Sequence, residues 1–324
     1  MKFLSEKYIK GFLNSNNKYD FKAVLIRIID QEKVSKMSFL DWTELELGKY
    51  LRSFKSVSAM ALNRQLSVLR SFADFISEKE NISNRNFSLG EDKLYDFIDK
   101  EELMQTTLNY EQYRHIKNQL DDNVRDKLLF ELPWYGLSNN MIKMLKISDI
   151  TFKMSNDFGW EVAFLSCQNL NEENDDEEVI INKPLIIKIE DPEVVEDIKK
   201  CIAETWHYIE SKDGLSKKMQ YRDSEYLIKP INVGKNKKED YISNPSLTLQ
   251  KTFVAKDITC NGINVHKLSI SNIRRSGLIY LLSPENEKDF SMDLITILYG
   301  YKNDTGLYWL KNFAKEKYNK TKQL

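Results

Sequence analysis

The sequence has few of the residues that mark secreted, β-rich or membrane-spanning proteins. Its 324 residues include only 11 glycines and 6 prolines, too few for the many tight turns of a sandwich or barrel, so a largely helical chain is expected. No apolar run approaches the roughly 20 residues that cross a bilayer, and the first residues lack the apolar core of a signal peptide. We therefore expect a cytoplasmic protein with no membrane partner.

Cysteine is also scarce. Cys167, Cys201 and Cys260 are odd in number and far apart in the chain. They have neither the spacing of metal ligands nor the pairing of a disulfide framework, which favours free thiols in a reducing compartment. We expect no metal site and no cofactor.

The net charge of −1 gives little indication of a nucleic-acid partner, but the charges are unevenly distributed. Residues 1–90 carry 15 Lys and Arg against 10 Asp and Glu, and residues 211–324 carry 20 against 12. The middle, 91–210, carries 13 against 27. Two basic ends suit a clamp around a polyanion, although ordinary surface variation would give the same totals.

The pattern predicts a mainly α chain with a small β-sheet (α+β) and two domains, at 1–104 and 105–324. The first is expected to be helical. Strand-like runs rich in Val, Ile and Phe lie at 151–153, 161–167 and 179–189, and they predict a small sheet in the second. A helix is expected at 92–102 near the junction, and another at 192–211 with Trp206 in its core stripe.

One helix of the first domain, expected at 57–79, has a polar face beside its apolar stripe. Leu62, Leu66, Leu69, Ala73 and Ile76 follow steps of three and four residues and predict a buried face. The candidate groove-facing residues are Asn63, Ser67 and Arg70, which line up beside this stripe, and Arg64, which points further round the helix. Such a face suits the major groove of DNA, but many solvated helix faces look alike.

The C-terminal third carries a set of motifs in a recognisable order. It contains Ser271-Asn272-Ile273-Arg274, then Leu298-Tyr299-Gly300-Tyr301, then Tyr308-Trp309-Leu310. This order resembles the C-terminal boxes of the tyrosine recombinases, or phage integrases. The polar helix resembles the signature helix of that family's core-binding (SAM-like) domain, and 108–150 resembles the opening of its catalytic domain.

The resemblance implies a catalytic scaffold from which most catalytic residues are missing. Arg274 fits a family arginine. The other positions depart from the family. Ser138 occupies the position of the first arginine, and the acidic stretch 168–178 replaces the hairpin that carries the lysine. Ser271 occupies the position of the first histidine, Tyr301 that of the second histidine or tryptophan, and Leu310 that of the nucleophilic tyrosine. Tyr308 lies two residues early, and we expect it to be a packing residue. Two guanidinium groups clamp the phosphate in the family, and serine cannot supply that charge.

We therefore expect a protein that is not an enzyme and binds double-stranded DNA at operator sites, as a transcriptional repressor that maintains prophage lysogeny. Lys267, Arg274 and Arg275 are further candidates for DNA contact, and lysines between 212 and 238 are candidates for phosphate. Two alternatives are a divergent recombinase using Tyr308 and His266, and an accessory protein of another recombinase. Weak self-association through the C-terminal helix is a further expectation, and His207 is expected to be a surface or packed residue.

Overall fold

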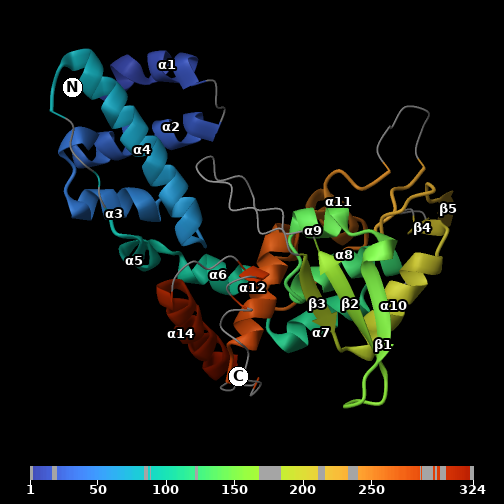
Figure 1. Cartoon of the computed structure of the whole chain (residues 1–324). Helices are drawn as coiled ribbons and strands as arrows, with labels where there is room; N and C mark the ends of the chain where they lie inside the picture. The colour runs from blue at the N-terminus through green and yellow to red at the C-terminus, as the bar shows by residue number, and fades with distance from the viewer. Residues whose placement is uncertain are drawn as a thin grey trace. The chain divides into compact units, whose positions relative to one another are not determined.

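The computed structural model shows an α+β chain, mainly helical, that divides into two compact units at Met1–Leu103 and Met104–Leu324 (Figure 1). The division lies one residue from the boundary expected from the sequence. The structure describes residues 3–16, 20–83, 87, 89–120, 123–167, 184–210, 216–232, 240–284, 286, 295, 298–299 and 304–321.

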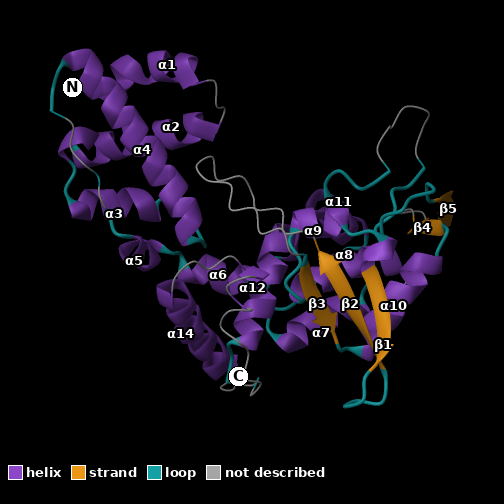
Figure 2. Cartoon of the chain, in the orientation of Figure 1, coloured by secondary structure: helices purple, strands orange, loops and turns teal. Residues whose placement is uncertain are grey.

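The first unit is helical throughout its described residues (Figure 2). Its elements are α1 (Leu4–Asn16), α2 (Asp20–Ser35), η1 (Phe39–Asp41), α3 (Glu44–Arg52), α4 (Ala59–Glu80), α5 (Glu91–Leu94) and η2 (Tyr95–Phe97). A further helix, α6 (Lys100–Thr106), runs across the division. The single helix expected at 92–102 is therefore wrong. Short helical pieces replace it, with Ile98 extended between η2 and α6.

The core of this unit is aromatic. Phe12, Phe39 and Phe72 are fully or almost fully buried, and the Phe39 and Phe72 rings stack with centroids 5.5 Å apart. The apolar stripe predicted for α4 is buried in full, because Leu62, Leu66, Leu69, Ala73 and Ile76 are all inaccessible to solvent. Burial of this stripe fixes which side of α4 faces outward.

The second unit surrounds a buried central helix, α8 (Val124–Trp134). The other helical elements are α7 (Tyr110–Asn118), α9 (Asn139–Met144), η3 (Ile147–Asp149), α10 (Pro192–Ala203), α11 (Pro245–Ala255), η4 (Val265–Lys267), α12 (Ile270–Leu281) and α14 (Asp304–Thr321). α12 packs so closely on α8 that a Cβ added to Gly277 would lie 2.0 Å from the carbonyl oxygen of Trp134. Glycine is therefore required at this crossing.

The predicted sheet is present as β1 (Ile150–Met154), β2 (Glu161–Cys167) and β3 (Leu185–Ile189), antiparallel in that order. Its apolar face, with Leu165 and Ile187, joins the core beside α8 and α10. The expected start of the third strand at 179 lies outside the described residues.

The helix expected at 192–211 is wrong in its second half. α10 ends at Ala203, and Trp206–Glu210 forms strand β4, which pairs antiparallel with β5 (Ser216–Gln220). Trp206, Tyr208 and Ile209 have high strand propensity, and pairing with a second strand outweighs the helical spacing that Trp206 continues.

Candidate nucleic-acid interface

The outward face of α4 is the clearest polar surface among the predicted site residues. Ser58 caps the helix and accepts a hydrogen bond from the amide of Ala61. Asn63, Arg64 and Ser67 are all exposed, on the side opposite the buried stripe. An amide, a guanidinium and a hydroxyl at this spacing offer the donors and acceptors that read base edges and phosphates.

The charge of this face changes along the helix. Arg64 lies near its N-terminal end, whereas Asp74 and Glu78 are exposed near its C-terminal end. Two carboxylates would repel a phosphate backbone. Only the first half of α4 is therefore suited to a polyanion.

Arg70 differs from the other three residues predicted on this helix. Its side chain is half-buried, and its Nε donates a hydrogen bond of 2.9 Å to the carbonyl oxygen of Phe87. The guanidinium thus fixes the segment after α4 against the helix. Substituting Arg70 would disturb the fold of the unit as well as any DNA contact, so it does not isolate a base-reading role.

Further basic residues lie where α3 ends and α4 begins. Lys49 and Arg52, in the last turn of α3, and Lys55, in the connection, are exposed. The guanidinium of Arg27 donates to the carbonyl of Ser53 in the same connection. This basic corner was not predicted from the sequence. Basic residues in the last turn of a helix before a short connection are nevertheless a pattern that the sequence contains.

In the second unit, the guanidinium of Arg274 is bound by backbone carbonyls. Its Nε donates to the carbonyl oxygen of Gly136 at 2.8 Å, and its Nη2 donates to that of Leu298. The ring of Tyr299 covers it at 5.2 Å from the guanidinium carbon to the ring centroid. Arg274 therefore ties α12 to two other segments of the unit.

Gly136 and Ser138 shape the turn that receives this guanidinium. Gly136 has a φ of +97°, and a Cβ there would approach the Tyr299 ring to 3.3 Å. Ser138 caps α9, accepting a hydrogen bond from the amide of Met141 at 3.2 Å. The position where the family resemblance calls for an arginine thus holds a helix cap.

The remaining predicted positions differ in exposure, and some fall outside the described residues. Ser271 and Lys267 are exposed and Arg275 is half-buried, while Tyr301 and the stretch 168–178 fall outside what the structure describes. Among the basic residues of 212–238, Lys217 and Lys218 are exposed on β5.

Tyr308 corrects an expectation. It is 70% exposed, whereas Leu307, Leu310 and Phe313 of the same helix are buried. The helix α14 packs on α12 within the chain, and Tyr308 lies on the exposed side of α14. It is therefore not a packing residue within this chain.

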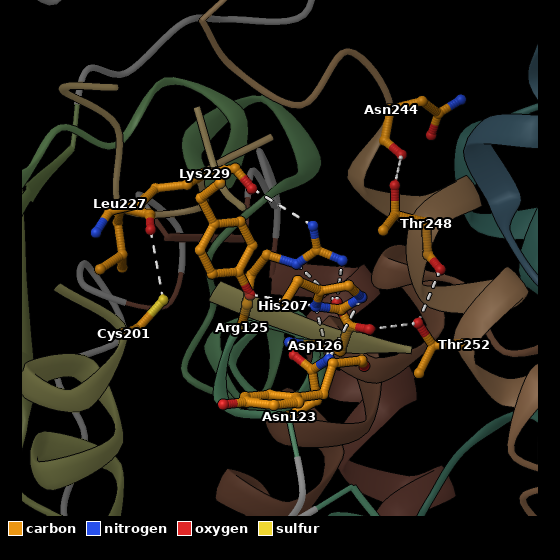
Figure 3. A network of polar contacts seen from close by, with 12 residues as sticks. Asn123, Arg125, Asp126, Cys201, His207, Leu227, Lys229, Asn244, Thr248 and Thr252 are labelled. Carbon is orange, nitrogen blue, oxygen red and sulfur yellow. Dashed lines mark hydrogen bonds and ion pairs between the residues drawn. The ribbon is translucent and has the colours of Figure 1, made fainter. Parts of the chain in front are cut away.

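A buried polar network connects the ribbon of β4 and β5 to α8 (Figure 3). His207 is 5% exposed, and its Nδ1 lies 2.7 Å from Nδ2 of Asn123, the cap of α8. Asp126 binds Arg125 and accepts a hydrogen bond from the hydroxyl of Thr252. Burial, and then the charge of Arg125, lower the pKa of His207 to about 4, so the ring is neutral at pH 7. The expectation of a packed histidine is confirmed.

A metal-binding cluster or a membrane-spanning helix would indicate a different function. Among the described residues, no cluster of His, Cys, Asp or Glu has the arrangement to hold a metal ion. No described helix is both long and apolar enough to cross a membrane. The three cysteines are free thiols, as expected.

Comparison with known proteins finds distant likenesses among solved structures. No family model matches the sequence, and no curated protein matches it. The structure of XerA recombinase matches with a TM-score of 0.41 and 10% identity, over 97% of this chain and 96% of that one. A lambda integrase fragment, residues 75–356, solved as a dimer bound to a COC′ core site, matches with a TM-score of 0.42 and 14% identity, over 96% and 94%. A longer lambda integrase dimer on the same kind of site matches with a TM-score of 0.40 and 14% identity, over 97% and 76%.

Proposed function

We propose that this chain is a sequence-specific binder of double-stranded DNA that acts as a transcriptional repressor in the cytoplasm and does not cut DNA. The observation that carries the proposal is the exposed first half of α4, where Asn63, Arg64 and Ser67 lie near the basic corner that ends α3. Cations that flank groove-reading side chains are the usual arrangement of a duplex-binding helix.

The lack of cleavage is supported by what Arg274 and Ser138 do in the second unit. Transfer of a phosphoryl group needs fixed positive charge at the scissile phosphate. The Arg274 guanidinium is occupied by the carbonyls of Gly136 and Leu298, and Ser138 caps a helix. Arg274 uses two of its five N–H donors on these carbonyls, and Ser138 carries no charge, so these two positions do not supply the pair of guanidinium groups that would clamp a phosphate.

The repressor role rests on a resemblance. Within the integrase-like proteins, the sequence resembles the master repressor of SPβ-type Bacillus prophages, which keeps lytic genes silent. Lysogeny is the corresponding biological role that we propose. Self-association through α14 would have to use its exposed side, which carries Tyr308, because Leu307 and Leu310 are buried within the chain.

A gel-shift titration against genomic fragments with excess competitor DNA tests the proposal. Each sample is also run after heating in detergent. We expect a discrete shifted band that disappears on denaturation. Absence of any specific shift would refute DNA recognition and favour the accessory-protein alternative.

The role of α4 is tested by two matched substitutions. Arg64 and Lys79 are both exposed cations of α4, and 15 residues place them about 22 Å apart along the helix axis. We expect Arg64→Ala to lower affinity for the selected fragment by about 5- to 150-fold and Lys79→Ala to change it less than about twofold. Equal effects of the two substitutions would contradict a specific role for the first half of the helix.

The exposure of Tyr308 favours one second candidate, a divergent recombinase. Tyr308 is 70% exposed, so its side chain is accessible to a phosphate. A nicked suicide substrate would trap a covalent protein–DNA adduct if Tyr308 attacks, and Tyr308→Phe would abolish that adduct. An adduct of this kind would overturn the non-catalytic part of our proposal and leave duplex binding intact.

A further inference from the structure

The outer face of the β4–β5 ribbon carries aromatic and basic side chains that the proposed duplex site does not use. Trp206 is 37% exposed and Tyr208 is 48% exposed, and both lie on β4. Tyr208 pairs with Lys218 across the ribbon, so Trp206, Tyr208 and Lys218 share one face. The Lys218 ammonium lies 4.6 Å from the Trp206 ring centroid and 5.7 Å from that of Tyr208.

The opposite face of the ribbon holds it against the unit. His207 alternates with the two aromatic residues and is buried against Asn123. The side chain of Asn123 also donates to the carbonyl oxygen of Tyr208 at 3.3 Å, and Tyr221 contacts His207 at 3.2 Å (Figure 3). The aromatic face is therefore presented from a fixed backbone, which reduces the entropy lost when a ligand binds.

We propose that this face binds single-stranded nucleic acid, with bases stacked on Trp206 and Tyr208 and a phosphate paired with Lys218. Exposed aromatic rings combined with a cation are the features that bind single strands without reading their sequence. The inference does not depend on duplex binding by α4.

The spacing of the rings favours a single strand over a duplex. Residues two apart on a strand are separated by about 7 Å, whereas neighbouring bases of a duplex are stacked about 3.4 Å apart. Rings at Trp206 and Tyr208 therefore suit two bases that have come apart from each other.

Lys218 does not block the rings. Its cation–π contact at an exposed site is worth about a two- to fivefold factor in an equilibrium, whereas stacking of one base on an aromatic side chain contributes about 5- to 150-fold in affinity. A base can therefore displace the ammonium from a ring. The displaced ammonium is then close enough to pair with the phosphate of the same strand.

The structure supplies matched controls. Lys217 is exposed next to Lys218 but pairs with Ile209, so it belongs to the opposite set of side chains. Trp160 is 42% exposed, but its ring stacks on Phe158 and its Nε1 donates to the carbonyl oxygen of Glu190. Trp160 thus tests whether any exposed tryptophan suffices.

The test uses the full chain and a fluorescein-labelled 12-residue oligothymidine, followed by anisotropy at low salt. We expect Trp206→Ala and Tyr208→Ala each to weaken binding by about 5- to 150-fold and Lys218→Ala to weaken it and reduce its salt dependence. Trp206→Phe should retain most of the affinity and show that loss in Trp206→Ala is not unfolding. Lys217→Ala and Trp160→Ala should bind like the unmodified chain.

Three results would overturn the inference. The first is that the unmodified chain does not bind the oligonucleotide. The second is that Lys217→Ala and Lys218→Ala lose the same affinity for it. The third is that Trp206→Ala loses as much affinity for a 12-base-pair duplex as for the single strand. Failure of the α4 proposal gives a different result, because Arg64→Ala acts on the duplex and leaves oligothymidine binding unchanged.

Discussion

Replacing Arg274 separates a structural role of its guanidinium from a role in holding phosphate. The side chain makes two hydrogen bonds from a charged group to backbone carbonyls, at Gly136 and Leu298. Such bonds contribute about 1.5–3 kcal/mol each. Because Arg274 is only half-buried, hydrogen bonds to water can replace part of this free energy in a variant, so we use the lower end of the range. The contact with Tyr299 adds about 0.5–1 kcal/mol.

Arg274→Ala is therefore expected to lower the free energy of unfolding by about 2–4 kcal/mol. Arg274→Lys retains the charge but has one ammonium in place of a planar fork, so it should lose about half as much. The assay is urea unfolding of the full chain followed by circular dichroism. We expect the midpoint urea concentration to fall, whereas the slope of the unfolding free energy against urea concentration stays unchanged.

Lys251→Ala is the control, because Lys251 is an exposed cation on α11, and its stability should change by less than about 0.5 kcal/mol. DNA affinity of the folded Arg274→Lys protein is measured in parallel. A stability change below about 0.5 kcal/mol in Arg274→Ala, together with a loss of DNA affinity and a smaller salt slope, would refute the structural role. The guanidinium would then act on phosphate.

Two other predictions follow from buried positions. Gly277→Ala should destabilise the chain by about 3 kcal/mol or more, because its Cβ would overlap the carbonyl of Trp134 unless α12 and α8 move apart; a thermal or urea midpoint equal to that of the unmodified chain would contradict the close crossing. The folded chain holds His207 neutral, with a pKa lowered from 6.5 to about 4, so the unfolded chain binds more protons and stability falls as pH drops through this window. Between pH 7.5 and 5 this term amounts to about 2 kcal/mol, and His207→Gln should show a correspondingly smaller loss over the same range.

The long elements were predictable because their sequence signal repeats many times. The helix expected at 57–79 is α4, Ala59–Glu80, since five apolar residues mark one stripe and Ser58 supplies a cap. Asn109 and Ser138 cap helices in the structure, and both stand directly before helical segments in the sequence. Such signals are local, so the sequence alone contains them.

The ribbon of β4 and β5 was missed because its signal is not local. Trp206 continues the helical spacing of the buried residues Val195 and Ile198, and nothing in the single sequence marks the end of α10 at Ala203. Pairing with residues 216–220 and the bonds from Asn123 to His207 decide the outcome. Tertiary contacts of this kind override the helical spacing of the apolar residues.

The sequence indicated which residues of the candidate site are polar and exposed better than it indicated what their side chains contact. Asn63, Arg64 and Ser67 are exposed together, as their spacing indicated. Arg70 belongs to the same spacing but binds the carbonyl of Phe87, which depends on how the chain returns after the helix. Arg274 was identified by its place in a motif, and only the structure shows that carbonyls occupy its donors.

Replacing Ser138 with the arginine that the family resemblance calls for tests whether one substitution is enough to restore DNA cleavage. If Ser138 were the only defect, Ser138→Arg would return positive charge at the position of the missing arginine. A single missing donor at a charged transition state costs about 10²–10³ in rate, so its return should be easily seen. The second guanidinium, however, is held by Gly136 and Leu298 and would have to leave both carbonyls to reach a phosphate. We therefore expect Ser138→Arg to form no detergent-resistant adduct on a nicked suicide substrate. A band that appears in Ser138→Arg and disappears in Ser138→Arg with Tyr308→Phe would show that the scaffold is one substitution from activity, and that the bonds of Arg274 are readily exchanged for phosphate.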